Sequence, residues 1–518
     1  MEILIDENTP LSRFDHHWKF CVGSAHAAYA LRHDYVKQLA EVHDDLGVER
    51  VRFHGVFGDD MRTLVKATEI VPFPFGGGYR EQSFRQCAVA YDNVLEAGMK
   101  PFVELGFMPK LLAKLPFARG AFFYKPIVSL PKSIEKWQDY IRAFTRFLID
   151  RYGREEVESW YFEVWNEPDL PVVFFDGGQK DYFKLYRATA EAVKSADEHI
   201  RVGGPATSGS KWIAAFLDYC EKTGAPVDFV STHQYAGDPI GGIENKEKGL
   251  GLDIDVFAAL TKRGSLRRDN ILDLYRAFMG VARAPEKLRA DALTESAKNV
   301  KALAGDKPVF YTEWNMCASF SAPCNDTPMP ACYLLHTVLH SQGSVDGSSV
   351  WCFSDLFEEF HQFPEEFHGG FGLMTQSGIK KPSYRALQFL NEAGDERFDT
   401  PAAGNADAAV FKKENGFHIL ASLLDFEESG KTESVTVRIK APAPSRVTLT
   451  RIDETHCNPL RLWREAGCPQ TPPPRLIEEL KTRSAPAEEP ADYTYEDGFI
   501  VIPLTVSSNE IKRVAITL

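Results

Sequence analysis

Short runs of apolar and β-branched residues alternate with longer amphipathic stretches between about residues 18 and 390. This alternation predicts an α/β fold, because parallel strands need long, usually helical, return connections. Helical spacing of apolar residues is clearest in 133–152, 181–199 and 384–391. The eight candidate strands start at Lys19, Arg50, Lys100, Ser159, Ile200, Val227, Lys307 and Ser348. Eight such units predict a (β/α)8 TIM barrel. An open doubly wound sheet is the alternative, but the G-x-G-x-x-G signal of its commonest ligand does not follow the first strand.

The pattern changes after Asp399, where short strand-like runs are bounded by Gly, Pro and Asn. Val435, Val437 and Ile439 alternate with polar residues, as in a half-buried antiparallel strand. We therefore expect a barrel over 15–395 with a long insertion at 236–305, and a C-terminal β-sandwich over 396–518. Residues 1–14 are expected to add an N-terminal strand to the sandwich. Proline clusters at 472–474 and 486–490 suggest a surface excursion from it.

The charge balance excludes several classes of partner. Asp and Glu number 73 against 59 Lys and Arg, for a net charge of −14, which argues against nucleic acid and anionic membranes.

The sequence has no apolar run of about 18 residues and no signal-like N-terminus. Its nine cysteines are scattered and never form C-x-x-C, which favours a reducing, cytoplasmic location. The oligomeric state is left open.

Two glutamates stand at the carboxyl ends of predicted strands, where active sites of TIM barrels lie. Glu167 ends the fourth strand within Trp-Asn-Glu-Pro, and Glu313 ends the seventh within Thr-Glu-Trp-Asn. Strands this far apart in order face each other across the barrel mouth. Paired carboxylates that flank one bond are what glycosidic cleavage requires. Taken singly, each glutamate could be a solvated or salt-bridged residue, but the pair at matching positions favours catalysis.

Other strand-end residues are candidates to bind sugar hydroxyls. His54, Asn166, His233 and Tyr235 suit hydroxyl contacts, although both histidines could instead be satisfied core residues. Arg52 is a candidate support for the nucleophile or a structural ion pair. Trp351 is either a sugar platform or a core side chain. Glu358 and Glu359 could accept hydrogen bonds from neighbouring hydroxyls or form a solvated loop pair.

The site residues do not form a metal-ligand set at the usual spacing, so we expect neither a metal nor a cofactor.

The ordered set of motifs resembles family 39 of the glycoside hydrolases, which contains β-xylosidases and α-L-iduronidase. The motifs are WKFCVGSAHA, VRFHG, VELGFMP, WYFEVWNEPDL, THQY, YTEWN and WCFSDLFEE. The resemblance implies a retaining mechanism with Glu167 as acid/base and Glu313 as nucleophile. It also places Asn166, His54, His233, Tyr235 and one or both of Glu358 and Glu359 in the sugar-binding shell.

The leading hypothesis is an exo-acting β-D-xylosidase that releases xylose from the non-reducing ends of small xylo-oligosaccharides. The alternatives within the family are α-L-iduronidase, β-glucosidase, β-galactosidase and arabinofuranosidase. Glu358 and Glu359 would repel the carboxylate of iduronate, which favours a neutral sugar. A carbohydrate-binding protein without activity is the alternative from another class. We further expect Glu313 to be ionised beside Arg52 and Tyr235 or Asn166, and the charge of Glu313 and partial burial to raise the pKa of Glu167.

Overall fold

Eight parallel strands close into a barrel in the computed structural model, which describes residues 2–66, 80–120, 122–171, 173–241, 288–318, 321–357, 363–400 and 404–518. Each strand pairs with the next in chain order, and the last pairs with the first. They are β3 (Cys21–His26), β4 (Arg50–His54), β7 (Lys100–Glu104), β8 (Tyr161–Glu163), β9 (Arg201–Thr207), β10 (Phe229–Tyr235), β11 (Val309–Asn315) and β12 (Gly347–Val350). The predicted barrel is confirmed, and all eight candidate strands form it.

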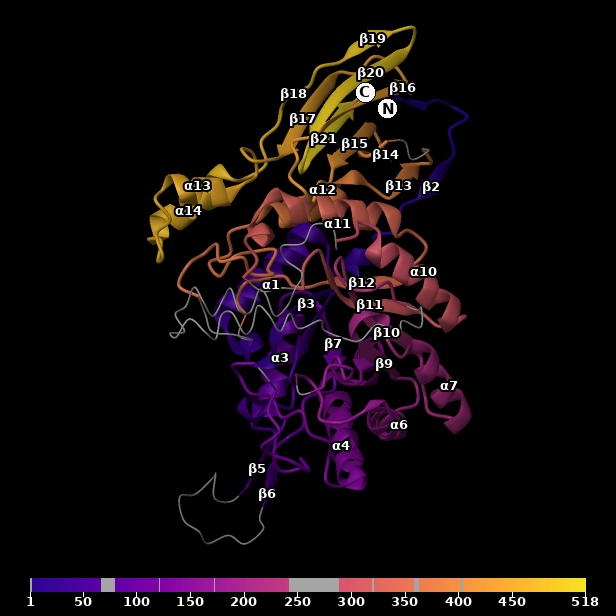
Figure 1. Cartoon of the computed structure of the whole chain (residues 1–518), viewed down its shortest axis with the longest axis vertical. Coiled ribbons are helices and arrows are strands. Elements are labelled where there is room, and N and C mark those ends of the chain that lie inside the picture. The colour runs from indigo at the N-terminus through magenta and orange to yellow at the C-terminus, as the bar shows by residue number, and fades with distance from the viewer. Residues whose placement is uncertain are drawn as a thin grey trace, which may run out of the picture.

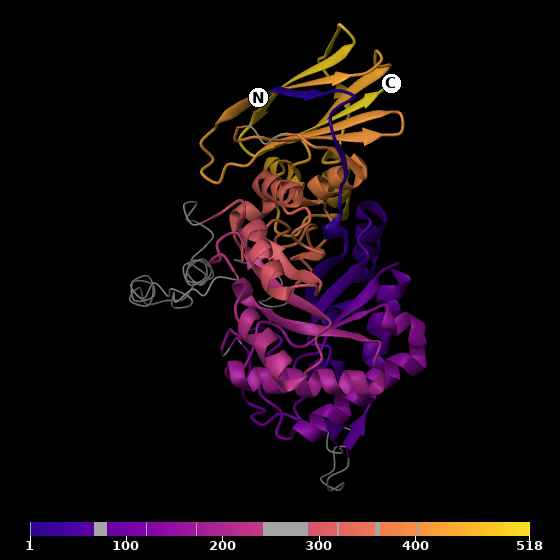
Figure 2. The same ribbon diagram turned by 90° about the vertical axis from the view of Figure 1, so that its right-hand side faces the viewer.

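One long helix follows each barrel strand and covers the outside of the barrel (Figures 1 and 2). The first two predicted helical segments form α4 and α6, and both bury apolar residues at helical spacing. In α4 these residues include Trp137, Phe144 and Leu148. Ser133 caps α4 by accepting a hydrogen bond from the backbone N–H of Lys136. The helices are α1 (His33–Leu46), α3 (Arg85–Glu96), α4 (Ile134–Tyr152), α6 (Gln179–Ala196), α7 (Ile213–Thr223), α10 (Ala292–Ala304), α11 (Pro328–His340) and α12 (Pro382–Ala393), with the short α5 (Arg154–Glu158) after α4.

The two ends of the barrel interior differ in chemistry. Near the amino ends of the strands, Cys21, Phe102, Phe229 and Phe310 form a small buried apolar cluster. Nearer the carboxyl ends, the buried side chains include charged and polar groups such as Arg52. Burial of charge is costly unless the groups pair, so the carboxyl ends must hold a connected polar network.

The C-terminal strands form two sheets, as expected for the predicted sandwich. One has the order β1-β16-β20-β19 and the other β18-β17-β21-β15-β14-β13-β2. Val435, Val437 and Ile439 of β16 are buried, in agreement with their alternation in the sequence. The strands are β1 (Glu2–Ile5), β2 (Leu11–Arg13), β13 (Glu396–Phe398), β14 (Asp407–Lys413), β15 (Gly416–Leu423), β16 (Thr432–Lys440), β17 (Arg446–Ile452), β18 (Glu489–Pro490), β19 (Thr494–Glu496), β20 (Phe499–Ser507) and β21 (Glu510–Thr517).

The first residues of the chain lie in the sandwich rather than in the barrel. β1 pairs in parallel with β16, and β2 pairs antiparallel with β13. Figure 2 shows this indigo segment running up to the orange and yellow strands. The sandwich in turn rests on the barrel through contacts of α11 and α12 with β15.

Two helices lie at and just before the surface excursion suggested by the proline clusters, and the second of them falls within it. They are α13 (Pro459–Glu465) and α14 (Pro474–Arg483), which project to one side of the sandwich (Figure 1). Each begins with proline, whose fixed φ suits the first turn of a helix and whose missing N–H costs nothing there. Trp463 and Leu480 belong to a small core of their own with Phe367. The prolines therefore start helices here rather than prevent them.

The predicted insertion at 236–305 is described only at its ends. Residues 236–241 continue from β10, and 288–305 contain α10. The remainder, 242–287, lies outside the described residues. A two-stranded sheet of β5 (Leu64–Lys66) and β6 (Arg80–Gln82) completes the described strands. Of the helices in the described ranges, none combines the length and the hydropathy needed to cross a lipid bilayer.

Candidate active site

The two predicted catalytic glutamates meet at the carboxyl end of the barrel. Glu313 lies on β11, and Glu167 lies in the loop that follows β8. One carboxylate oxygen of each lies within 4.8 Å of the other, and a ring nitrogen of His233 lies within the same distance of both. Retaining glycosidases place their carboxyl groups about 5–5.5 Å apart, whereas inverting enzymes need about 6.5–9.5 Å to fit a water molecule. The spacing suits direct attack by one carboxylate.

Glu313 receives hydrogen bonds on both of its carboxylate oxygens. Nη1 of Arg52 donates to Oε1 over 2.9 Å, and the hydroxyl of Tyr235 donates to Oε2 over 3.0 Å. Nε2 of His54 lies 3.5 Å from Oε1. A cation and a hydroxyl donor stabilise a negative charge on this group. Asn166, the expected alternative donor, does not donate to Glu313. Its Nδ2 has no partner among the described residues, and its Oδ1 accepts a hydrogen bond from Nη2 of Arg52 over 2.8 Å.

Arg52 joins three buried carboxylates. Besides Glu313 it contacts Oε2 of Glu163 through Nε at 2.7 Å and Oε2 of Glu104 through Nη2 at 3.0 Å. The guanidinium is 0% exposed. Burial opposes its charge, but the three carboxylates outweigh burial and raise the pKa of Arg52 above its ordinary value. Arg52 therefore forms a buried ion-pair network with Glu104 and Glu163 and also contacts Glu313, so its two predicted roles do not exclude each other.

Glu104 and Glu163 are site residues that the sequence analysis did not single out. His54 Nδ1 lies 2.6 Å from Oε2 of Glu104, and the hydroxyl of Thr312 donates to Oε1 of Glu163 over 2.8 Å. Burial raises the pKa of Glu104, but His54 and Arg52 outweigh it, and the pKa lies below the ordinary value. Each glutamate is the last residue of a largely apolar strand, KPFVE or YFE. A glutamate in such a run needs a buried cation, and this was the available signal.

Glu167 has the opposite electrostatic environment. Burial, followed by the charges of Asp169 and Asp238, raises its pKa to about 8. The expectation that Glu313 supplies the neighbouring charge is thus corrected, because the leading charges come from these two aspartates. Nδ1 of His233 lies 2.9 Å from Oε1 of Glu167. Burial lowers the pKa of His233 to about 4, so this imidazole is neutral at pH 7.

Buried polar atoms of the site that lack a protein partner among the described residues include Oε1 of Glu104, Nδ2 of Asn166 and Nε2 of His233. The last two belong to predicted sugar-binding residues. A buried polar group without a partner is costly, so both atoms suit a ligand hydroxyl that completes their hydrogen bonds. The predicted hydroxyl-binding role of these two residues agrees with this geometry.

Trp351 lies against the site but is only 3% exposed. Its ring centroid is 4.9 Å from that of His54. A Cβ on Gly23 would come within 2.5 Å of the indole, so glycine makes room for it. Trp351 therefore packs beside His54 and offers little free surface for stacking on a sugar. Glu358 and Glu359 lie outside the described residues.

Glu167, His233 and Glu313 are close enough for one metal ion to touch all three. The guanidinium of Arg52, at 2.9 Å from Glu313, would oppose a cation at that position. The contact between Arg52 and Glu313 instead favours acid–base chemistry by two carboxyl groups, in which Glu167 carries a proton and Glu313 is charged.

Comparison with known proteins gives the same chemistry. The family model described as "Glycosyl hydrolases family 39" matches residues 1–246 and 277–500. A β-xylosidase of Caldicellulosiruptor saccharolyticus is 36% identical over 100% of this chain and 98% of its own length. One of Geobacillus stearothermophilus is 32% identical over 97% and 93%. The crystal structure of a family 39 enzyme from Xanthomonas axonopodis pv. citri superimposes with a TM-score of 0.79 at 26% identity, covering 100% of this chain and 97% of that one. The chain therefore belongs to glycoside hydrolase family 39, a family of retaining glycosidases.

Proposed function

We propose that the protein is an exo-acting β-D-xylosidase that releases xylose from the non-reducing ends of xylo-oligosaccharides. The observation that carries the reaction type is the approach of Glu167 and Glu313 to within 4.8 Å, with a proton favoured on the first and a charge on the second. The xylose specificity is supported by two relatives that match nearly the whole chain and are named β-xylosidases.

In the first step, Glu313 attacks the anomeric carbon while Glu167 gives its proton to the leaving oxygen. The C1–O bond breaks, and an ester forms between the sugar and Glu313. Arg52 and Tyr235 hold the attacking carboxylate in place through its two oxygens. Fixed donors of this kind need no reorganisation as the charge moves.

In the second step, the roles of the two carboxyls change. Glu167, now ionised, takes a proton from water, and the water oxygen attacks the anomeric carbon. The ester bond breaks, Glu313 regains its charge, and xylose leaves with its original anomeric configuration. Esterification removes a negative charge within 4.8 Å of Glu167, which lowers its proton affinity, while the larger effects of burial, Asp169 and Asp238 stay in place.

Sugar hydroxyls are assigned to the polar atoms that face the two glutamates. Nδ2 of Asn166 and Nε2 of His233 supply hydrogen-bonding atoms without protein partners in the described structure. His54 and Tyr235 add groups at the nucleophile. Trp351 bounds the sugar from below, and Glu358 and Glu359 are proposed as further acceptors.

A panel of nitrophenyl glycosides tests the specificity. We expect the β-D-xyloside to be turned over faster than the β-glucoside, β-galactoside, α-L-arabinofuranoside and α-L-iduronide, and NMR to find β-xylose as the first product. Faster turnover of another glycoside would replace xylosidase by that specificity and leave the retaining mechanism intact. Sugar binding without hydrolysis over hours would instead support a carbohydrate-binding protein.

A cytoplasmic location and a role in xylan breakdown belong to the same proposal. The nine cysteines, all in the described ranges, form no disulfide, which suits a reducing compartment. Small xylo-oligosaccharides are products that xylan-cleaving reactions outside the cell would supply. Cell fractionation with a periplasmic marker tests the location, and enrichment with that marker would contradict it.

A further inference from the structure

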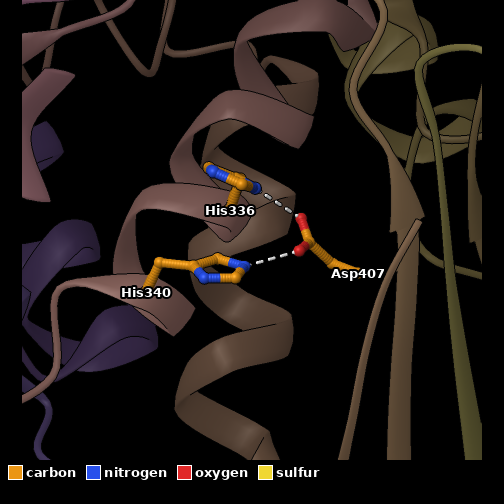
Figure 3. A group of neighbouring side chains, drawn as sticks. All are labelled: His336, His340 and Asp407. Atoms are coloured by element: carbon orange, nitrogen blue, oxygen red, sulfur yellow. Dashed lines mark hydrogen bonds and ion pairs between the residues drawn. The ribbon is translucent and has the colours of Figure 1, made fainter. Parts of the chain in front are cut away.

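A second cluster of histidine and carboxylate groups lies far from the barrel mouth, where the barrel meets the sandwich. His336 and His340 stand one turn apart on α11, and Asp407 is the first residue of β14. Figure 3 shows both imidazoles directed from the helix toward this one carboxylate. The three side chains come from both parts of the fold.

The potential ligand atoms converge in space. Nδ1 of His336 lies 2.8 Å from Oδ2 of Asp407, and Nε2 of His340 lies 2.7 Å from Oδ1. One ligand atom from each residue lies within 4.8 Å of the other two. Zinc bonds of about 2.0–2.2 Å in a tetrahedron place ligand atoms about 3.3 Å apart. The His–Asp contacts thus need to open by about half an ångström, which a small rotation of the aspartate side chain supplies.

A second carboxylate faces the other nitrogen of His336. Oδ1 of Asp291, the residue before α10, lies 3.2 Å from Nε2 of this imidazole. A neutral imidazole carries one N–H and can donate to only one of its two carboxylate neighbours. With a metal on Nδ1 and the proton on Nε2, His336 satisfies both. A carboxylate behind a ligating histidine is a common feature of metal sites, because it fixes the tautomer and the ring orientation.

The charges and access of the cluster also suit a divalent cation. Two carboxylates balance a charge of +2, while neutral imidazoles add none. The side chains of His336, His340 and Asp407 are 15%, 34% and 11% exposed, so an ion can reach them and keep a water ligand. The nearby Arg397 donates to the backbone carbonyl of Leu339, and its positive charge also acts on Asp407 without forming an ion pair with it among the described residues. In the described structure Asp407 forms ion pairs with the two histidines alone, whereas the active-site group includes the guanidinium of Arg52.

We propose that His336, His340 and Asp407 bind one divalent transition-metal ion of the zinc class, with Asp291 orienting His336. Two imidazoles and a carboxylate favour Zn²⁺, Co²⁺, Ni²⁺ or Cu²⁺ over Mg²⁺ and Ca²⁺, which prefer all-oxygen sites. The ion connects a barrel helix to a sandwich strand and stabilises their contact. It binds in place of protons on Nδ1 of His336 and Nε2 of His340, so each proton present there is released to solvent.

Zinc binding to the full-length protein tests this site without any assay of glycosidase activity. After removal of metal with a chelator, incubation with Zn²⁺ at pH 8 and dialysis to remove the excess, we expect one Zn²⁺ per chain by elemental analysis. Co²⁺ in place of Zn²⁺ should give visible bands of four-coordinate geometry. Saturation with Zn²⁺ at about 100 times Kd should raise Tm by about 2–4 °C. His340→Ala and Asp407→Asn should lose both the ion and the Tm rise. Asp291→Asn should bind about 10–100-fold more weakly.

Two control variants separate this site from other places on the chain. His199→Ala removes an exposed histidine, and Glu313→Gln alters the active-site group; both should keep one Zn²⁺ and the Tm rise. Loss of Zn²⁺ in Glu313→Gln would place the ion in the active site and overturn the proposal. Binding of clearly less than one Zn²⁺ per chain by the wild type would also overturn the proposal. The same holds if Tm falls in His340→Ala and Asp407→Asn but Zn²⁺ changes Tm in none of the proteins. Either result would leave these residues as a metal-free hydrogen-bond network. None of these outcomes depends on which sugar the enzyme cleaves.

Discussion

Replacing Glu167 with alanine tests the roles that we propose for the carboxyls of Glu167 and Glu313. The pKa of Glu167 is raised to about 8, mainly by burial. At pH 6, below this raised pKa, the free enzyme therefore holds a proton on this group. The variant removes that proton donor while Arg52 and Tyr235 still hold Glu313.

The size of the effect depends on the leaving group. Positioned proton transfer contributes about 10²–10⁴ in rate, or about 2.7–5.4 kcal/mol in activation free energy. Xylobiose has a poor leaving group that needs the proton, so kcat/KM should fall by this full factor. A dinitrophenyl xyloside has an acidic leaving group that needs none. Its kcat/KM should fall by less than about tenfold, and hydrolysis of the glycosyl-enzyme should become rate-limiting.

Azide identifies the face that each carboxyl serves. In Glu167→Ala, azide can replace the base-assisted water and should restore turnover of the aryl glycoside as a β-xylosyl azide. In Glu313→Ala, azide can only displace the leaving group from the opposite face and should give the α-azide at a low rate. NMR of the products distinguishes the two anomers. Glu221→Ala, which removes an exposed glutamate of α7, is the matched control and should behave as the wild type.

Two results would refute this reasoning. A β-azide from Glu313→Ala would mean that the roles of Glu313 and Glu167 are reversed. An equal loss on xylobiose and on the aryl glycoside in Glu167→Ala would mean that Glu167 does not protonate the leaving group.

Three further predictions follow from the site and the core. The kcat/KM for xylobiose should fall as pH rises through about 8, since Glu167 then loses its proton. Asp238→Asn removes a negative neighbour of Glu167 and should shift this alkaline fall in the pH–rate profile to lower pH. A profile whose alkaline fall does not move would contradict this. Tyr235→Phe removes the donor to Glu313 and should lower kcat/KM by about 10–150-fold, from about 1.5–3 kcal/mol for a hydrogen bond to a charged group, and an unchanged rate would exclude the role. Lys381→Met leaves two buried aspartates without their shared cation and should lower the free energy of unfolding by about 3–5 kcal/mol in urea titration, whereas Lys222→Met on the exposed face of α7 should change it little.

The barrel could be predicted because its strands and helices follow local patterns that packing reinforces. The alternation of apolar runs located the strands that carry the two glutamates, and Glu167 and Glu313 do meet. Glu313 lies on β11 as expected, whereas Glu167 lies in the loop four residues after the end of β8 rather than on the strand. The helices α13 and α14 were not predicted, and the prolines at 472–474, which lead into α14, were interpreted only as part of a surface excursion. Whether proline starts or interrupts a helix depends on the residues after it and on a surface to pack against, which for α14 is the small core around Leu480.

The raised pKa of Glu167 was predicted together with its largest cause, which is burial. The predicted charged cause was wrong, because Glu313 was expected and the leading charges are those of Asp169 and Asp238. Asp169 lies two residues along the chain, but Asp238 comes from the loop after β10. Spacing in the sequence does not reveal how two loops fold over one carboxyl. Only three-dimensional contacts decide which charges a buried group meets.

The pairing of β1 with β16 has a consequence for how the chain is made. Ile3 pairs with Val437, so the partner of this strand emerges from the ribosome more than 400 residues later. At about 5–20 residues per second, the amino-terminal segment waits for about 20–90 s before its partner exists. During synthesis the barrel can close first, with the opening strand still unengaged, and a long-range contact of this kind forms slowly. Completion of the sandwich thus becomes a late event in biogenesis, and an added tag or fusion at the amino end would interfere with that event rather than with the barrel.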